Sequence, residues 1–474
     1  MQFERGSAHF GRGLLIVVAL LVVAALGLSA CGGGSSSTGS DTQESPGSEE
    51  STGTKGGSEK GEESAGAALV AEPEPNGFPL SEGGESNPEL IKEALVEKIP
   101  KAQLTSAYEE AFGKGYDFES GLAPWAKNAY EIALQKPTKE QEEFVLECVH
   151  TSTCKRDSGD LVIAYPDDFG ANSWRRENYI GTVYALARYP QVKEVIHTEA
   201  AGDLQTLQSN IRSAISQGAD AIIGDYDAGD AVLPQIREAR AAGIPEIAVS
   251  QGLPSAQYDG SDLNWLLNQN LCQLGYNLGG VAAESAPDAK VAMFTGIPGN
   301  PFAAGWQPCA EEAIEKGGAT IQTHGTTEWT EQGNAQAASA LLAEGVPNAV
   351  IYDQDMEQFE AKFISAGLKE LPSMAGFLNQ GSYEVWKQQK DKGNEFPLYS
   401  TTTQNSNSFL AAYLAVAAAE EMVPPELEEG QIENPTGLLD GEELEKQYVK
   451  GGGSTAAFGS LLPENILIAS LEAK

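Results

Sequence analysis

The stretch 160–181 constrains the fold more than any other part of the chain; it reads D-L-V-I-A-Y-P-D-D-F-G-A-N-S-W-R-R-E-N-Y-I-G. Its apolar run at 161–165 is long enough for a buried strand and too short for a helix. Pro166 ends the run, a polar loop follows at 167–172, and a helix-compatible segment begins near Ser173. Strand, loop and helix in this order form the first unit of a parallel α/β sheet, in which ligands bind beyond the carboxyl ends of the strands.

The same unit recurs along the rest of the chain. After residue 160, strands are expected at 192–197, 220–224 and 246–250, separated by helical segments. A second series begins near Asp262, with strands expected at 289–295, 320–325, 349–352, 374–377 and 397–403. This order is typical of parallel sheets covered by helices. We therefore expect an α/β protein with two doubly wound parallel-sheet lobes joined by a hinge.

The expected domains follow from these two series. Lobe 1 spans residues 160–260, lobe 2 spans 261–403, and residues 404–474 form a crossover helix and C-terminal hinge segments, with a last strand at 465–469. Residues 67–159 contain four helix-compatible segments and form a small helical extension. One of these helices opens with Thr138 and Gln141 at capping-box spacing. The role of this extension cannot be read from its sequence.

The N-terminus has the pattern of an export signal. Arg5 and Arg12 precede an uncharged apolar run at 14–28, which is short for a membrane span. Leu28-Ser29-Ala30-Cys31 resembles the lipobox of bacterial lipoproteins, which implies that residues 1–30 are a signal peptide and that Cys31 is lipidated. The alternative is an uncleaved anchor with a chance cysteine. Residues 31–66 are rich in Gly, Ser and Glu and are expected to be a disordered tether.

Charge and motifs exclude several functions. The net charge of −38 would repel a polyanion, so nucleic-acid binding is not expected. The Gly-rich stretch at 296–300 lacks the Gly-Lys-Ser/Thr of a phosphate loop, and there is no Gly-x-Ser-x-Gly elbow. The histidines are scattered. We expect a binding protein rather than an enzyme, with no cofactor and no metal.

Several strand–loop junctions carry a family resemblance. Besides the opening stretch, they are Q-S-N-I-R-S-A-I-S-Q-G-A-D-A-I-I-G at 208–224, A-R-A-A-G-I-P-E-I-A-V-S at 239–250, V-A-M-F-T-G-I-P-G-N at 291–300 and Y-D-Q-D at 352–355. From residue 160 onward the chain resembles the type I periplasmic binding proteins of the ribose- and galactose-binding kind. The resemblance implies a monomer that binds a sugar or polyol between two lobes and delivers it to ABC permease subunits. Ser250-Gln251 stands where the family often has an acid, so neither ribose nor galactose is specified.

A sugar site needs planar hydrogen-bonding groups and aromatic faces. The loops that follow the strands supply both. In lobe 1 the expected ligand contacts are Asp168, Phe169, Asn172, Trp174, Arg175, Asp225, Tyr226 and Gln251. In lobe 2 they are Asn300, Phe302, Trp306, Asp355, Asn379 and Gln404.

Structural roles compete with these assignments. In lobe 1, Asn172 and Asp225 could cap a helix or turn, Trp174 could be a core residue, and Arg176 rivals Arg175 as the ligand-facing cation. In lobe 2, Asn300 could only shape its turn, Asp355 could cap a helix, and Phe302 and Trp306 could be wall or core.

The remaining cysteines suggest disulfides. Because the protein is expected to be exported, Cys148 and Cys154 should form a small-loop disulfide; a metal site would need more ligands than these and His150. Cys272 and Cys309 lie in neighbouring helices of lobe 2 and would form a second disulfide, with two free buried cysteines as the alternative.

The expected function is a membrane-tethered, extracytoplasmic solute-binding protein of an ABC importer. A surface sensor that signals occupancy to a membrane receptor is the alternative, and a surface scaffold without a ligand is a third possibility.

Overall fold

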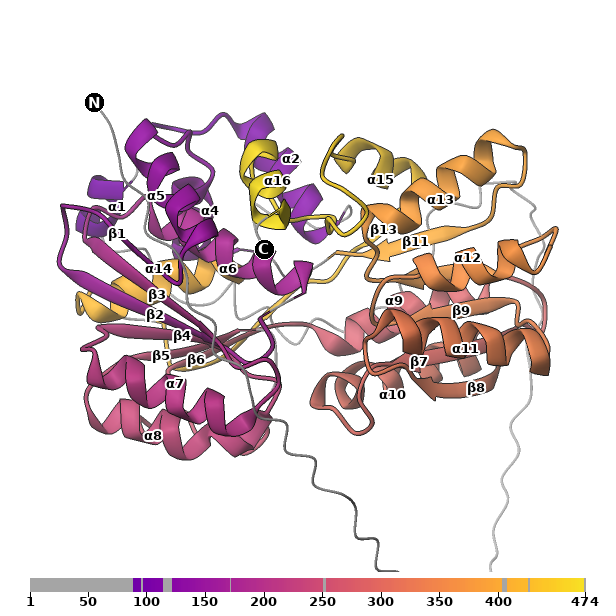
Figure 1. Ribbon diagram of the computed structural model, residues 1–474, viewed down its shortest axis with the longest axis horizontal. Helices are drawn as coiled ribbons and strands as arrows, with labels where there is room; N and C mark the ends of the chain where they lie inside the picture. Colours follow the sequence, from indigo (N-terminus) through magenta and orange to yellow (C-terminus); the bar gives the residue numbers. More distant parts are fainter. Residues whose placement is uncertain are drawn as a thin grey trace, which may run out of the picture. The chain divides into compact units, whose positions relative to one another are not determined.

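The computed structural model describes residues 88–94, 97–113, 122–170, 172–249, 253–402, 407–424 and 427–472 (Figure 1). The expected signal peptide, the tether and Cys31 lie outside these residues, as do Gln251 and Gln404. In the part of the chain that is described, no helix combines the length and the apolar character needed to cross a membrane.

The first sheet has seven strands in the order β1-β3-β2-β4-β5-β6-β12. All neighbours are parallel except β1, which pairs antiparallel with β3. Residues 265–269, which we assigned to lobe 2, form β6 and pair with β5 and β12, so the first lobe extends to Gln269. The strands are β1 (Thr153–Lys155), β2 (Leu161–Asp167), β3 (Val192–Glu199), β4 (Ala221–Asp225), β5 (Glu246–Val249), β6 (Trp265–Gln269) and β12 (Gly430–Asn434).

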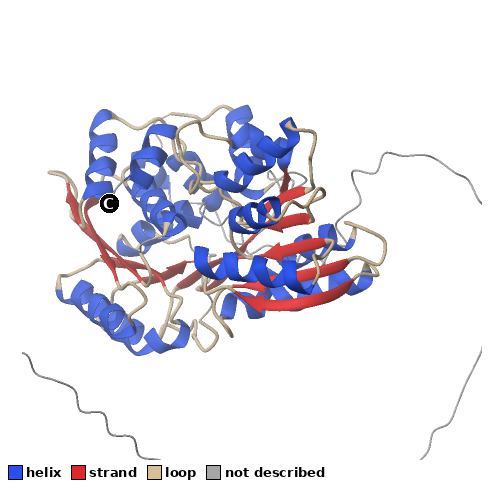
Figure 2. Ribbon diagram, turned by 45° about the vertical axis from the view of Figure 1, so that its right-hand side comes forward, coloured by secondary structure: helices blue, strands red, loops and turns tan. Residues whose placement is uncertain are grey.

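Helices cover both faces of this sheet (Figure 2). One face packs on α7 (Leu204–Ser216), η2 (Gly229–Val232) and α8 (Leu233–Ala241) through a cluster that includes Leu207, Ile236 and Leu266. The other face packs into the largest core, which includes Ile163, Val183 and Phe409. The helices of that face are α4 (Pro124–Ala133), α5 (Lys139–His150), α6 (Ser173–Leu186), α14 (Asn407–Ala419) and α16 (Glu464–Glu472).

The second sheet has six strands in the order β13-β11-β10-β9-β7-β8, and only β13 is antiparallel to its neighbour. Its strands are β7 (Lys290–Thr295), β8 (Thr320–Thr326), β9 (Ala349–Tyr352), β10 (Ser373–Gly376), β11 (Leu398–Thr401) and β13 (Leu438–Asp440). α9 (Leu271–Ala283) and α10 (Pro301–Lys316) cover one face. α11 (Glu331–Glu344), α12 (Glu357–Ser365), α13 (Gln380–Asp391) and α15 (Gly441–Gln447) contribute to the core on the other. Two helix-covered, mainly parallel sheets confirm the predicted fold class.

The chain crosses between the lobes at several points. β6 leads into α9, β11 leads towards α14, and β12 leads into β13. A further crossing follows α15 and ends in α16, whose Ile466 and Leu467 lie in the first core. The strand expected at 465–469 is therefore wrong. Glu464 in the first turn and the buried set Ile466, Leu467 and Ser470 follow helical rather than strand spacing.

The described helices of the N-terminal extension pack on the first lobe, and residues 153–155 near its end form β1 of the first sheet instead of a helix. Trp125 and Tyr130 of α4 are fully buried in the first core, beside Tyr413 and Phe409 of α14. The extension also contains α1 (Pro88–Ala94) and α2 (Lys101–Phe112). The Thr138 capping box is present at the start of α5.

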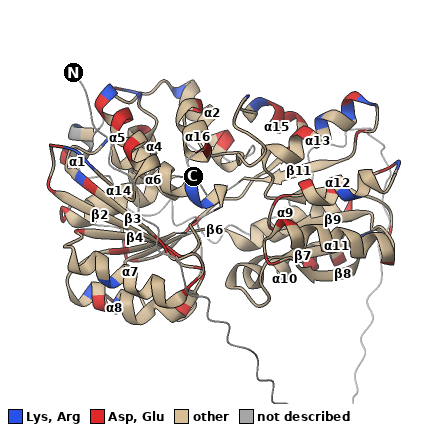
Figure 3. Cartoon of the chain, viewed as in Figure 1, with Lys and Arg blue, Asp and Glu red and all other residues tan. Residues whose placement is uncertain are grey.

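Both expected disulfides are present. Cys148–Cys154 joins the last turn of α5 to β1, and Cys272–Cys309 joins α9 to α10. The second bond lies where α9 and α10 approach closely: a Cβ on Gly275 would come 2.1 Å from the carbonyl oxygen of Trp306. Acidic positions are spread over helices of both lobes (Figure 3), which accords with the negative charge of the chain.

Candidate functional site

A buried ion cluster lies at the carboxyl ends of β2 and β4. Arg175, in the first turn of α6, is 2% exposed. Its Nη1 donates to Asp167 Oδ1 at 3.3 Å and lies 2.6 Å from Asp225 Oδ1, a close ion contact without hydrogen-bond alignment. Its Nη2 pairs with Asp227. One guanidinium therefore pairs with three carboxylates at the ends of two strands. The planar set of N–H donors on an arginine side chain suits such multiple pairing.

Burial and the neighbouring charges shift the pKa values of Arg175 and Asp168. Burial alone lowers the pKa of Arg175, but Asp225, Asp227 and Asp167 together raise it, so the guanidinium stays charged. Asp168 accepts from the Ala228 N–H at 2.6 Å. Burial, with help from the Asp227 charge, raises the pKa of Asp168 from 3.8 to about 6, although the Ala228 N–H and Arg175 act in the opposite direction.

The expected lobe 1 residues have different roles. Asn172 caps α6 by accepting from the Arg175 N–H at 2.9 Å. Trp174 is half-buried and stands against the Arg175 guanidinium, 5.5 Å from its ring centroid, and Phe169 is half-buried beside the cluster. The prediction that Tyr226 contacts the ligand is wrong. Its side chain is fully buried among α7 and α8 and donates to Glu246, so it cannot line an open site.

The lobe 2 counterpart centres on Asp353, at the carboxyl end of β9. Its Oδ1 accepts from Trp329 Nε1 at 2.9 Å, and its Oδ2 accepts from Trp306 Nε1 at 3.1 Å and from the Thr295 hydroxyl. Burial raises the pKa of Asp353 to about 6, against the lowering effect of these donors. Asp353 was not among the expected site residues, although its place directly after a buried strand could have indicated it.

The expected lobe 2 residues are divided between structural and open positions. Asn300 caps α10 and also donates to Thr295, while Phe302 and Trp306 lie in the core beneath α9 and α10. Asp355 accepts from the Asn379 N–H and the Ser382 hydroxyl, both at 2.9 Å. Asn379 is half-buried, and its side chain does not cap α13.

Three buried amides lie where the chain crosses between lobes. Gln269 ends β6, Asn434 ends β12 as its register partner, and Asn407 opens α14; each is 2% exposed. Among the described residues, neither the side-chain nitrogen nor the oxygen of any of the three has a hydrogen-bond partner. Buried polar groups are normally satisfied, so unpaired amides at such a place need an explanation. Sequence reasoning missed these hinge amides because it looked only at the loops that lead into helices.

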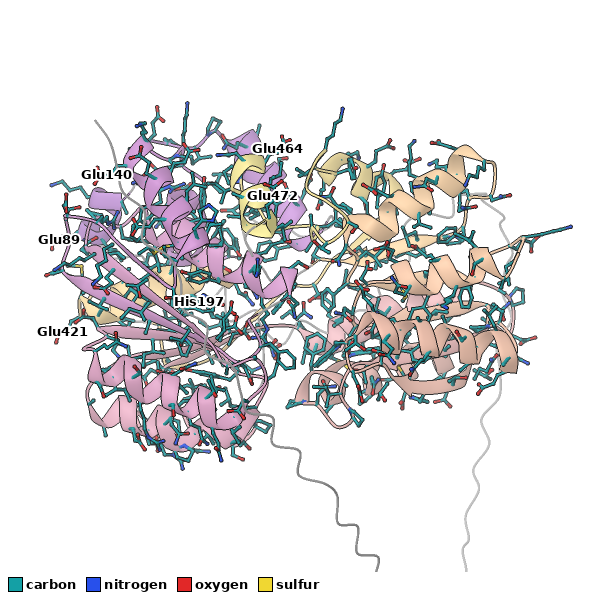
Figure 4. The ribbon with its side chains drawn as sticks, viewed as in Figure 1. Glu89, Glu140, His197, Glu421, Glu464 and Glu472 are labelled. Carbon is teal, nitrogen blue, oxygen red and sulfur yellow. A yellow bond between two sulfur atoms is a disulfide. The ribbon has the colours of Figure 1, made fainter. Side chains whose placement is uncertain are left out.

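A groove of about 570 Å³ lies elsewhere in the first lobe. It is bordered by Cys148–Thr153, α6, β3 and α7, and includes His197 (labelled in Figure 4) and Tyr179. None of the expected ligand residues lines it, so it is separate from the candidate site. Within the described ranges, no group of three or more His, Cys, Asp or Glu side chains is arranged to hold a metal ion.

Replacing Arg175 should be costly. Arg175→Met leaves three carboxylates without their cation in a buried place, and removal of one partner of a buried ion pair destabilises by about 3–5 kcal/mol. Urea denaturation of wild type and variant measures this loss. The control is Arg212→Met, which breaks a half-exposed pair with Glu238 and should have little effect. Equal losses in the two variants would contradict a structural role for the cluster.

Asp168 should make stability depend on pH. Because its folded pKa of about 6 lies above the ordinary 3.8, its contribution is fully present below pH 3.8 and is lost as pH rises through 6. Asp168→Asn removes this dependence. The melting temperature of the variant, relative to that of wild type, should therefore rise between about pH 5 and about pH 7. A difference that stays constant over this range would show that the carboxyl titrates normally.

The comparison with curated proteins gave no match. Among solved structures, an ABC transporter solute-binding protein from Bacillus halodurans C-125 with bound myo-inositol has 19% identity and a TM-score of 0.51, covering 61% of this chain and 98% of that one. One from Actinobacillus succinogenes 130z with bound D-allose has 17% identity and a TM-score of 0.52, covering 60% of this chain and all of that one (100%).

A third similar structure is the fructose-binding periplasmic domain of a hybrid two-component system, with 17% identity and a TM-score of 0.51, covering 61% of this chain and 94% of that one. These likenesses show the shared fold. The family described as periplasmic binding protein domain matches residues 166–423, which is more than half of the sequence. The expectation of a binding protein rather than an enzyme agrees with that family. The chain therefore belongs to the periplasmic binding proteins.

Proposed function

We propose that this protein is a membrane-tethered solute-binding protein that captures a sugar or polyol between its two lobes and delivers it to an ABC importer. The lobes would close about the hinge because ligand contacts to both favour the closed form. In this proposal, lipidated Cys31 anchors the protein on the outer side of the cell membrane, and the tether spaces the receptor from it. Several acyl chains on one residue would suffice for stable anchoring.

The observation that carries the proposal is the set of unpaired hinge amides. Gln269, Asn407 and Asn434 offer paired donors and acceptors, which suit the adjacent hydroxyls of a sugar or polyol. Asp168 in lobe 1 and Asp353 in lobe 2 add carboxyl groups at strand ends, and Trp174 and Trp329 add half-buried indoles. This combination is the usual lining of a carbohydrate site. Myo-inositol, D-allose and fructose in the names of similar structures agree with it.

The charges of the site would favour neutral ligands. Arg175 is fully engaged by Asp167, Asp225 and Asp227, so it is not available to bind a ligand carboxylate. Its role in this proposal is to position the strand ends, not to contact the ligand. The carboxyl groups that remain would accept hydroxyl hydrogen bonds and repel an anion.

A sensor is the second candidate. It is favoured by one observation, the likeness to a fructose-binding domain of a two-component system. Both candidates share ligand capture and differ only in the partner that reads the closed form. Reconstitution with permease subunits encoded beside this protein would separate them, because only an importer component stimulates transport.

Calorimetry against myo-inositol, allose, fructose and other sugars and polyols tests ligand capture. Trp174→Ala in lobe 1 and Asn379→Ala in lobe 2 should each weaken binding of any ligand found by about tenfold or more, since each loses a stacking or hydrogen-bonding contact. Leu204→Ala and Asn394→Ala, at exposed positions of the same lobes, serve as matched controls and should bind as wild type. If no compound gives heat, the proposal of a sugar or polyol ligand is contradicted. If both variants bind the ligand as wild type does, the ligand site lies elsewhere.

For the hinge amides we predict that one substitution preserves or raises the stability of the free protein but lowers its affinity for the ligand. Gln269→Met keeps the shape but removes two buried, unpaired polar atoms, so the free protein should be as stable as wild type or more stable. The same change should weaken ligand binding by about tenfold or more, because the donor and acceptor are lost. Denaturation and calorimetry measure the two effects. A variant that is less stable and binds normally would show that the amide is structural.

A further inference from the structure

Within the segment between α15 and α16, residues 449–463 connect the lobes outside the part of the chain that matches the family. It leaves the second lobe after α15 and reaches α16 on the first (Figure 1). α16 is held there by Ile466 and Leu467 in the first core and by Asn465, which donates to Glu142 of α5 at 2.6 Å. Figure 4 labels Glu464 and Glu472, the first and last residues of α16. We call residues 449–463 the strap.

The strap is bonded closely to the second lobe. The Gln380 N–H donates to the Ala456 carbonyl at 2.9 Å, and the Gly381 N–H donates to the Ser454 carbonyl at 2.8 Å. Ala457 forms an antiparallel bridge with Asn379. Phe458 is 1% exposed in the second core, edge-on to Tyr383 at 6.2 Å.

The same few residues also hold the first lobe. The Ala457 N–H donates to Glu177 Oε1 at 2.9 Å, and both partners are buried. Ala456 is fully buried in the first core, and Leu462 joins the same core just before α16. Glu177 lies one turn beyond Trp174 on α6, and Asn379 is itself a candidate ligand residue. The strap therefore joins the lobes at the edge where the candidate ligand groups lie.

We propose that the strap is a restraint on lobe opening, an additional tie between the lobes that lies outside the part of the chain matching the family. Backbone bonds and the buried Phe458 fix residues 454–458 to lobe 2, while Leu462 and α16 are fixed to lobe 1. Once Ala456 and Ala457 give up their contacts with lobe 1, only residues 459–461 can absorb a change in the separation of the lobes. Extended chain spans at most about 3.6 Å per residue, so three residues allow little movement. Opening must break the Ala457–Glu177 bond or extract buried side chains, which makes the open form rarer and ligand exchange slower.

The test measures lobe separation without ligand and so does not depend on the proposed function. Spin labels at Ser213→Cys and Ser339→Cys, exposed on α7 and α11, report an interlobe distance distribution in the full chain with Cys31→Ser. The wild-type strap should give one narrow distribution, with any open form below about 10%. Insertion of Gly-Ser-Gly-Ser between Gly459 and Ser460 lengthens the free crossing and should add a longer-distance population above that level.

Three further variants make the test decisive. The same insertion after the exposed Gly453 lengthens the chain only where both neighbours belong to lobe 2, so it should leave the distribution unchanged. Glu177→Ala removes the bond to Ala457 and should broaden the distribution, whereas Glu177→Gln keeps an acceptor oxygen and should restore it. If the insertion between Gly459 and Ser460 and the Glu177→Ala variant both give the wild-type distribution, the strap does not restrain the lobes. If the insertion after Gly453 acts as strongly as the one at 459–460, the effect is not one of crossing length, and the proposal fails as well.

Discussion

The buried pairing of Arg175 with Asp167, Asp225 and Asp227 is the interaction on which the carboxyl edge of the first sheet depends. Three carboxylates at the ends of neighbouring strands would repel one another and would be costly to bury without a cation. Arg175 removes that conflict from the first turn of α6, so the same residue fixes the start of the helix against the sheet. In the second lobe the equivalent problem is solved without a cation. There, two indole N–H groups and a hydroxyl satisfy the single carboxylate of Asp353.

These two solutions produce different chemistry at the two strand edges. The lobe 1 edge is an ionic network with one carboxyl, Asp168, that is weakly acidic because it is buried beside Asp227. The lobe 2 edge carries aromatic rings and the carboxyl groups of Asp353 and Asp355, which accept from neutral N–H and hydroxyl donors. The hinge amides lie where the chain passes from one lobe to the other and add unpaired donors and acceptors. The strap then limits how far the two edges can separate, so the proposed binding and the proposed restraint act on the same edge.

Much of the fold could be predicted from the sequence because buried parallel strands are short, continuous apolar runs bounded by polar loops. The run at 161–165 and the loop after it were sufficient to predict β2, the start of α6 and the repeated unit. Residues 265–269 were assigned to the wrong lobe because the neighbour of a strand is set by tertiary pairing and not by its own residues. The run at 465–469 was read as a strand because five apolar-rich residues do not distinguish a strand from a buried helix.

The site was harder to predict, since position after a strand does not fix where a side chain points. Tyr226 follows β4 as Asp225 does, yet it turns into the core and pairs with Glu246. Arg175 was predicted to face the ligand, with Arg176 as its rival, but it is buried and its partners are carboxylates of its own lobe. Gln269 and Asn434 could be recognised only once their strands were seen to pair, because their importance comes from lacking partners in a buried place.

The most direct test of the account is whether one ligand reaches both lobes at once. The chain has six tryptophans, and fluorine NMR of protein labelled with 5-fluorotryptophan reports on each of them. Addition of a sugar or polyol that gives heat in calorimetry should shift the Trp174 and Trp329 resonances together, at the same ligand concentration. The resonance of the core residue Trp125 should stay in place. A shift confined to one lobe, or to neither of these two indoles, would contradict capture of the ligand between the lobes.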